Sequence, residues 1–482
     1  MSTYSKGDTN FTGQLKILLG KIYGRSPLKD SVLERAIAYY DLREFIQEKL
    51  DELARNIAEL KKKADDKSSI RIIKLEREQR EYHQELAFER HERFQHLHTI
   101  CLEILELSEG ENFDDTNRKS AQVLGTIQLL SPTEGKKIAT TNEVSKPLYK
   151  GILTLRLLDQ LCLNKLMPNS YIDQILKNEE FSAYVNLATE NKETYQKFVE
   201  LVKIPVLMAA LLQDIGNYHP DAQKIMLGSD GKKDGFRTLD VEERKALLQI
   251  NYRETVKYLV DGVGAAMYIG NSKVDRDKFN KKENNKLQFI KYLLKSSVQP
   301  KLGLGNLLKI PQIYTSIILS TKESYNYKLL PKVYQALYQN AERGICRKDI
   351  VDLLYKITGA FPQGYGVTYI PSDIDENVRY EYGVVTQLYP ENPEEPICRS
   401  ATRNLTFIGH GHDMLIKRSC NLYYVETAKK FSTISKERLN EILELLSSNY
   451  QERQSLDLLP RCWQPTEYFS MKNNQKLWNR PR

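Results

Sequence analysis

Long apolar runs and closely spaced cysteines are both missing from this chain of 482 residues. The longest apolar stretch, residues 199–212, contains Glu200, Lys203 and Pro205 and is shorter than the ~18 residues that a membrane-spanning helix needs. The first residues lack the apolar segment of a secretory signal peptide. The six cysteines lie far apart without a CxxC pair, which indicates reduced thiols rather than a disulfide framework. These absences predict a cytoplasmic protein without a membrane span.

A strong charge of one sign is also missing. The chain has 71 Lys and Arg against 63 Asp and Glu, a formal net charge of +8, and this mild excess does not favour specific DNA binding. Residues 271–301 are more basic and include Lys281, Lys282 and Lys286. A solvated helix face is the simpler interpretation of these lysines. The alternative is that they bind a nucleotide or an acidic partner.

The region 31–108 has the pattern of a helical arm. Apolar residues recur there at alternating steps of four and three, which is typical of a coiled-coil seam. In the first half of the arm these residues are Leu42, Ile46, Leu50, Leu53, Ile57 and Leu60. Residues 64–69 interrupt the pattern before a second apolar run, so we expect a helical hairpin or, alternatively, one long dimeric coil. The arm is predicted to mediate self-association or to bind a protein partner.

Changes in composition along the chain predict a mainly α protein with six segments. The expected core is a helical bundle in which residues 199–214 form a central, nearly all-apolar helix. Alternating residues with glycine and proline after Phe361 predict a small β extension, and the aromatic tail is expected to dock on its own domain or on a partner. The segments are a polar tail at 1–30, the arm at 31–108, a linker at 109–146, a helical domain at 147–360, the β extension at 361–430, and a C-terminal helix and tail at 431–482.

Two short stretches carry a resemblance to a known family. Residues 209–220 read AALLQDIGNYHP, which resembles the buried helix end of HD-superfamily phosphohydrolases, where a His-Asp pair precedes Ile-Gly. Residues 359–371 read GAFPQGYGVTYIP and are followed by Gly-Val-Val and Asn-Pro-Glu-Glu-Pro, which is similar to the β extension that closes many HD-GYP domains. The likeness covers about 147–400. It implies a helical HD-type domain with cyclic-di-GMP phosphodiesterase activity on a site of two or three metal ions.

The residues at the family's metal-binding positions differ from that pattern. Gln213 stands where the family has the first histidine, Asp214 is retained, and Asn251 stands where the next histidine is expected. His219 is the one histidine between residues 99 and 409. Because a binuclear centre needs several imidazole and carboxylate ligands, we expect no metal or other cofactor here and no hydrolysis. The resemblance then implies a catalytically degenerate bacterial signalling or scaffold protein, which binds cyclic-di-GMP or a protein partner.

Two other functions stay open from the sequence. One is an active metal-dependent phosphodiesterase that binds Fe, Mn or Zn through Asp214 and His219, together with Glu323 or His412. The role of the turn that contains His410 and His412 is itself undefined, although short His-x-His pairs occur in metal sites. The other is an interaction module in which the arm is the active part and the HD-like domain is a folded spacer.

Overall fold

The structure is a computed structural model of the whole chain. It describes residues 7–26, 28–63, 66–132, 135, 137–166, 168–176, 192–298, 303–371, 380–407, 413–431 and 460–479. These residues are mainly helical and include a small antiparallel sheet near the C-terminus, as predicted. Within them no helix has both the length and the apolar character required to cross a bilayer. The predicted helix at 435–448 and the turn with His410 and His412 lie outside these ranges.

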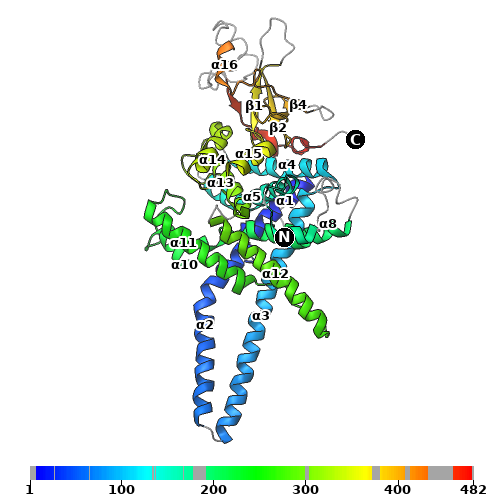
Figure 1. Ribbon diagram of the computed structural model, residues 1–482. Coiled ribbons are helices and arrows are strands. Elements are labelled where there is room, and N and C mark those ends of the chain that lie inside the picture. The colour runs from blue at the N-terminus through cyan, green and yellow to red at the C-terminus, as the bar shows by residue number, and fades with distance from the viewer. Residues whose placement is uncertain are drawn as a thin grey trace. The chain divides into compact units, whose positions relative to one another are not determined.

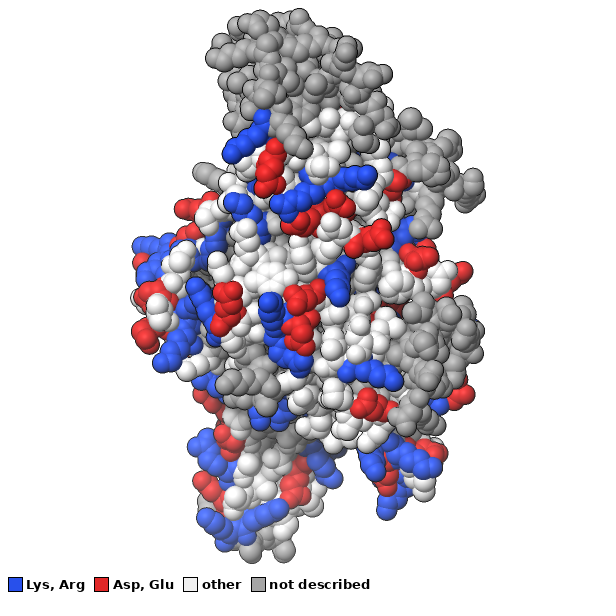
Figure 2. Space-filling model, turned by 45° about the horizontal axis from the view of Figure 1, so that its top comes forward, with Lys and Arg blue, Asp and Glu red and all other residues white. Residues whose placement is uncertain are grey.

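The chain folds into two compact units, and each is assembled from separate stretches of sequence. Unit 1 comprises residues 1–19, 104–196 and 299–482, and unit 2 comprises residues 20–103 and 197–298. Lys, Arg, Asp and Glu are interspersed over the described surface that Figure 2 shows, without a large area of one sign. This distribution agrees with the mild net charge of the sequence.

The arm in unit 2 is an antiparallel hairpin of two long helices (Figure 1). Helix α2 is Val32–Lys63, and helix α3 is Asp66–Ser108, of which residues up to 103 belong to unit 2. Lys61 Nζ lies 2.7 Å from Glu76 Oε1, and Lys49 Nζ lies 4.0 Å from the ring centroid of Tyr82. These cross-helix contacts pair the two helices of one chain. Of the two arrangements that the sequence allowed, the structure has the hairpin.

The rest of unit 2 is built around one fully buried helix. Every residue of α9 (Ile204–Leu212) is buried, as its all-apolar sequence predicts. A π-helical turn, η2 (Val199–Lys203), precedes it, and such turns are common where proline removes a backbone donor, here at Pro205. Around α9 lie the short η3 (Ile215–Tyr218), α10 (Pro220–Leu227), α11 (Val241–Lys257), η4 (Tyr258–Val263) and α12 (Lys273–Val298).

Unit 1 combines a helical layer with the sheet. Helix α5 (Ile138–Leu163) packs against α4 (Phe113–Leu130), α13 (Asn306–Ile318) and α15 (Lys348–Thr358). The sheet has the order β4-β3-β2-β1-β5, and its described neighbours are all antiparallel. Its strands are β1 (Gly366–Tyr369), β2 (Glu381–Val385), β3 (Ile397–Ala401), β4 (Met414–Leu415) and β5 (Cys462–Trp463). The unit also contains α6 (Ser170–Leu176), η5 (Gly303–Gly305), η6 (Tyr327–Lys332), α14 (Val333–Glu342), α16 (Val425–Phe431), η7 (Thr466–Phe469) and η8 (Asn474–Lys476). Helix α1 (Asn10–Tyr23) belongs to it up to residue 19, and helix α8 (Lys192–Phe198) up to residue 196.

The aromatic C-terminal tail docks on its own unit. Trp463 and Trp478 are buried, and their indole Nε1 atoms donate to the main-chain oxygens of Gly383 (3.2 Å) and Thr386 (2.8 Å). A Cβ added at Gly125 would come 2.2 Å from the ring of Trp478, so glycine allows the close packing of α4 on this ring. Of the two expected docking partners, the tail therefore uses its own domain.

Two predicted segment assignments differ from the structure. The N-terminal tail contains α1, whose residues Leu15, Leu18 and Ile22 are buried. The predicted linker at 109–146 contains α4 and the first turns of α5. In α4 the Asn112 side chain caps the helix by accepting from Asp115 N at 2.9 Å, and residues 120–128 of this helix are all buried. Polar residues at the ends of both segments indicated loops, whereas in α4 they form the cap of a core helix.

Candidate functional site

The segment that resembles the HD motif lies at the end of α9. Gln213 follows the last residue of α9 and is buried, Asp214 is half-buried, and the chain then turns through η3. The Oε1 atom of Gln213 has no hydrogen-bond partner among the described residues. The structure thus places these residues at the end of a buried helix, as the apolar run before them predicts.

Asn251 is brought directly against this turn by α11. Its Nδ2 donates to the main-chain oxygen of Gln213 at 3.1 Å, and its Oδ1 accepts from Thr255 Oγ1 at 3.3 Å. Thr255 Oγ1 also accepts from the amide of Gly216 at 3.0 Å. A Cβ added at Gly216 would come 2.2 Å from the carbonyl oxygen of Asn251, so the two backbones are in close contact. These neutral hydrogen bonds join the turn to α11.

His219 caps the next helix, α10. Its Nδ1 accepts from the amide of Asp221 at 3.2 Å, which places the proton of the neutral ring on Nε2. Nε2 lies 3.8 Å from Glu254 Oε2, and the ring packs edge-on against Tyr40 at 5.2 Å. Burial lowers the pKa of His219 below its usual value, and the nearby charges of Glu254 and Asp221 only partly oppose this effect. His219 is therefore an uncharged capping residue at neutral pH.

Glu254 is the most buried charge near this turn, with 2% of its side chain exposed. Arg43 Nη1 lies 2.9 Å from Oε2, Arg253 Nε lies 2.6 Å from Oε1, and Lys257 Nζ lies 3.4 Å from Oε1. Burial alone would raise the pKa of Glu254, but the hydrogen bond from Arg253 and the charges around it outweigh burial and lower this pKa. Glu254 is accordingly ionised at neutral pH and holds three cations around it.

A metal site of the expected kind is not formed by these residues. Within the ranges that the structure describes, no three His, Cys, Asp or Glu side chains converge closely enough to hold a cation. Glu323 belongs to unit 1, whereas Asp214 and His219 belong to unit 2. The chemistry that this arrangement supports is ion pairing and hydrogen bonding.

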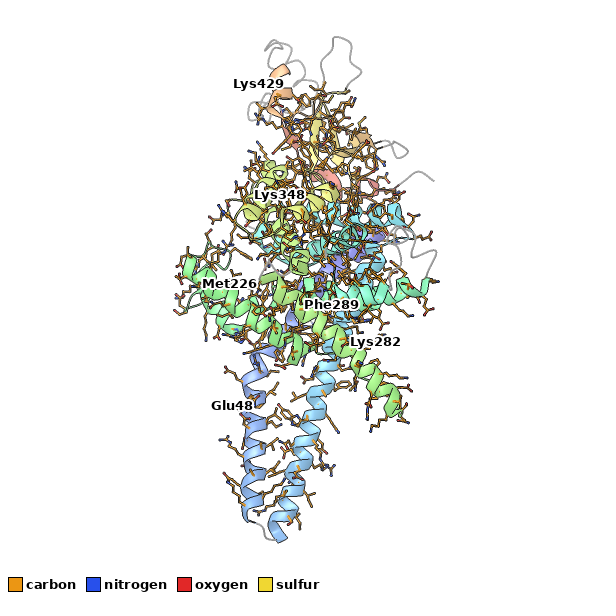
Figure 3. All side chains as sticks on the ribbon, in the orientation of Figure 1. Glu48, Met226, Lys282, Phe289, Lys348 and Lys429 are labelled. Atoms are coloured by element: carbon orange, nitrogen blue, oxygen red, sulfur yellow. The ribbon has the colours of Figure 1, made fainter. Side chains whose placement is uncertain are left out.

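The three lysines singled out in the basic stretch lie on α12. Lys282 Nζ is 2.8 Å from Glu200 Oε1, and Lys286 Nζ is 2.5 Å from Glu283 Oε1 and 3.7 Å from Glu200 Oε1. Lys281 is exposed. In Figure 3, Lys282 marks the polar half of this helix and Phe289 the half that is buried. Two of the three lysines are thus neutralised by carboxylates of unit 2.

Sequence reasoning overlooked Glu254 and Arg43. Glu254 follows Asn251 by three residues, and with Arg253 and Lys257 beside it the stretch has the composition of a solvated helix face. Arg43 is 211 residues away in the chain, on the arm. No local pattern links it to α11, so only the fold brings the two together.

Comparison with known proteins gives no relative that could assign this site. No protein-family model, no curated protein and no solved structure matches the chain. The resemblance to HD-GYP domains consequently rests on the motifs of the sequence alone.

Proposed function

We propose that the protein is a non-catalytic helical scaffold that assembles with a second copy of itself through the arm. In this proposal the HD-like part of the chain supports the arm and does not hydrolyse a phosphodiester. The observation that carries the proposal is the apolar surface that the hairpin leaves exposed. Phe45, Ile73 and Phe88 are 62%, 63% and 58% exposed.

The seam of the hairpin is only half covered. Leu50 and Leu60 of α2 and Leu75 and Leu86 of α3 belong to the seam, yet all four are of intermediate exposure. Two helices enclose a seam from one direction only, whereas four-helix bundles surround it. A second hairpin packed on the first would remove the open side of this seam from water.

The outer face of α3 also has apolar residues in line. Ile70 and Phe88 are eighteen residues apart, which is five turns of an α-helix, so they lie along one line of its surface. Helical periodicity places this line on the far side from Leu75 and Leu86. Large apolar side chains exposed along one line of a helix are available to pack against a protein partner.

The charges of the arm are compatible with a second copy as the partner. Residues 41–62 carry five Lys or Arg and six Asp or Glu, and residues 69–92 carry the same numbers. Each helix is therefore almost neutral, and two arms do not repel each other as they approach. A strongly basic or acidic partner would gain little from this surface.

The close contact of Gly216 with Asn251 supports the non-catalytic part of the proposal. The two segments that carry the HD-like positions meet through their backbones, and their polar groups bond to one another. A binuclear hydrolase instead needs two cations about 3.5–4 Å apart with a water between them. The side chains of Asn251 and Thr255 are used in these hydrogen bonds and therefore do not present ligands to such a pair.

Sedimentation-equilibrium analysis of the full-length protein tests the self-association. We expect a monomer–dimer equilibrium in which Phe45→Ser with Phe88→Ser weakens the dimer at least about tenfold, because each phenylalanine contributes about 1–2 kcal/mol when buried. Val241→Ser is the matched control, since Val241 is 79% exposed on α11 and outside the arm. A monomer at all concentrations, or equal weakening by the control, would contradict the proposal.

A separate assay tests the absence of hydrolysis. Purified protein is incubated with cyclic-di-GMP and an excess of Mn²⁺ or Fe²⁺, and we expect no turnover. Turnover that is lost in Asp214→Ala would favour the active phosphodiesterase instead. Because this assay does not depend on the arm, its result tests the absence of hydrolysis separately from self-association.

A further inference from the structure

Three cationic side chains of unit 2 surround a single buried carboxylate. Arg43 extends from α2, Arg253 and Lys257 extend from α11, and all three contact Glu254 within 3.4 Å. The side chains of the three cations are 32%, 53% and 41% exposed, so solvent and solutes can approach them. We call Arg43, Arg253 and Lys257 the cationic cluster.

The charges around the cluster do not cancel. Glu254 supplies one negative charge against the three positive charges of the cluster. Asp221, which lies 3.7 Å from His219, also pairs with Lys224 at 3.4 Å, and His219 is neutral at pH 7. This leaves a local surplus of two positive charges.

The cluster also retains hydrogen-bond donors. An arginine guanidinium has five N–H donors and a lysine ammonium has three. Among the described residues, the side chains of Arg43, Arg253 and Lys257 contact no acceptor other than Glu254. Most of their donors are therefore available to a ligand.

We propose that the cationic cluster binds a phosphate monoester or inorganic phosphate in its dianionic form. The two negative charges of this group match the local surplus, and its oxygens match the fork of an arginine and the point charge of a lysine. The three cationic groups contact the same carboxylate, Arg43 at Oε2 and Arg253 and Lys257 at Oε1, so they lie close together and favour one small anion over several separate ions. The proposal does not depend on self-association of the arm.

Glu254 acts in this site as a positioning residue. Its buried carboxylate fixes the three flexible side chains on one side of α11 before a ligand arrives, which reduces the conformational entropy lost on binding. Its main-chain oxygen accepts from Tyr40 Oη at 3.3 Å, which further joins α2 to α11. The ligand would thus meet a cluster that is already arranged.

Titration of the full-length protein with inorganic phosphate at constant ionic strength, followed by calorimetry, tests the site. We expect saturable binding that Arg253→Gln with Lys257→Gln weakens at least about tenfold, because each substitution removes a charge-assisted hydrogen bond to the anion. The control is Lys245→Gln, which removes one positive charge from an exposed position eight residues, or about 12 Å, from Arg253 along α11. We expect the control to bind as the wild type does.

Further ligands separate a specific site from general attraction. AMP and O-phosphoserine, both monoesters, are expected to compete with phosphate. If AMP competes more strongly, the natural ligand is a nucleotide; if O-phosphoserine does, it is a phosphorylated side chain. A phosphodiester, which carries one charge per phosphate, is expected to compete more weakly. The proposal is overturned if the wild type shows no saturable binding, if Lys245→Gln weakens binding equally, or if the diester binds as well as the monoesters. Thermal unfolding of each variant without ligand verifies that it is folded.

Discussion

The backbone of Gly216 lies against the carbonyl oxygen of Asn251 so closely that a Cβ at residue 216 would come 2.2 Å from that oxygen. The neighbouring atom belongs to backbone and cannot rotate away. The same contact is reinforced by the bond from Asn251 Nδ2 to Gln213 O. This junction holds the turn after α9 against helix α11.

Replacing Gly216 is therefore expected to destabilise the protein. Gly216→Ala should lower the free energy of unfolding by about 1–3 kcal/mol, because the added methyl group overpacks a fixed backbone contact. Gly20→Ala is the control, since a Cβ there meets nothing within 4 Å and lies inside α1, where alanine favours the helix. Urea denaturation of both variants measures the difference. Equal stability of the two would show that α11 can move away from the turn.

The hydrogen bonds of the Asn251 side chain are the basis of a second prediction. Asn251→Ala removes the donor to Gln213 and the acceptor of Thr255, so we expect a loss of about 1–3 kcal/mol in unfolding free energy. Asn340→Ala is a suitable comparison, because Asn340 also donates its side-chain amide to a main-chain oxygen, that of Ala336, but within a single helix. A loss no larger than that of the comparison would contradict a joining role of Asn251.

The network around Arg156 in unit 1 predicts a larger effect. The Arg156 side chain is 1% exposed, and its Nη2 lies 2.8 Å from Glu109 and 2.9 Å from Asp159. Arg156→Met would remove a buried cation from two buried carboxylates, at a cost of about 3–5 kcal/mol. Arg77→Gln, which breaks an exposed pair with Glu81, should cost at most about 0.5 kcal/mol. Guanidinium denaturation of the two variants tests this contrast.

The pH dependence of stability follows from the capping histidine. The pKa of His219 is lowered in the folded state, so the unfolded state binds a proton first as the pH falls. The stability that neutral His219 contributes is fully present above the unfolded-state pKa of about 6.5. It decreases as the pH falls below that value and is lost once the histidine of the folded protein is also protonated. The lowered pKa of Glu254 acts in the same direction at lower pH. We expect the unfolding free energy to fall between about pH 7 and pH 5.

His219→Asn tests how much of the pH dependence of stability comes from this histidine, because asparagine retains a capping oxygen but does not titrate. The variant should lose stability less steeply than the wild type over the same pH range. His83→Asn, on an exposed position of α3, should leave the slope unchanged. If His219→Asn keeps the slope of the wild type, the pH dependence arises from other groups, of which His96 and His98 also have lowered pKa values because of burial.

The last prediction concerns the packing of the C-terminal tail. Trp478→Ala should destabilise unit 1 by about 3–5 kcal/mol, because it leaves a cavity beside Gly125 and frees the Thr386 oxygen. Met471→Ala, at an exposed position of the same tail, is expected to change stability little. Near-ultraviolet circular dichroism and thermal unfolding measure both variants. A stable Trp478→Ala protein would mean that the tail adds nothing to the core.

Periodicity alone predicted the elements whose side chains repeat strongly. The seam from Leu42 to Leu60 indicated the arm, the apolar residues before Gln213 indicated the buried helix, and alternation after Phe361 indicated the sheet. Such repeats determine which face of an element is buried whatever its neighbours are. The segments that contain α1 and α4 were assigned wrongly, because the polar residues at their ends are types that occur both in helix caps and in loops.

The sequence by itself determined that Gln213 and Asn251 stand where the resemblance to HD domains implies histidine, and that the protein has an amphipathic arm. Tertiary structure alone decided that the arm folds back as a hairpin and that Arg43 meets Glu254 across 211 residues of chain. The physical reason is that side-chain type and spacing are local properties, whereas an ion pair between distant residues depends on how helices pack. The spacing of residue types along a sequence does not predict which distant charged residues the packing of helices will bring into contact.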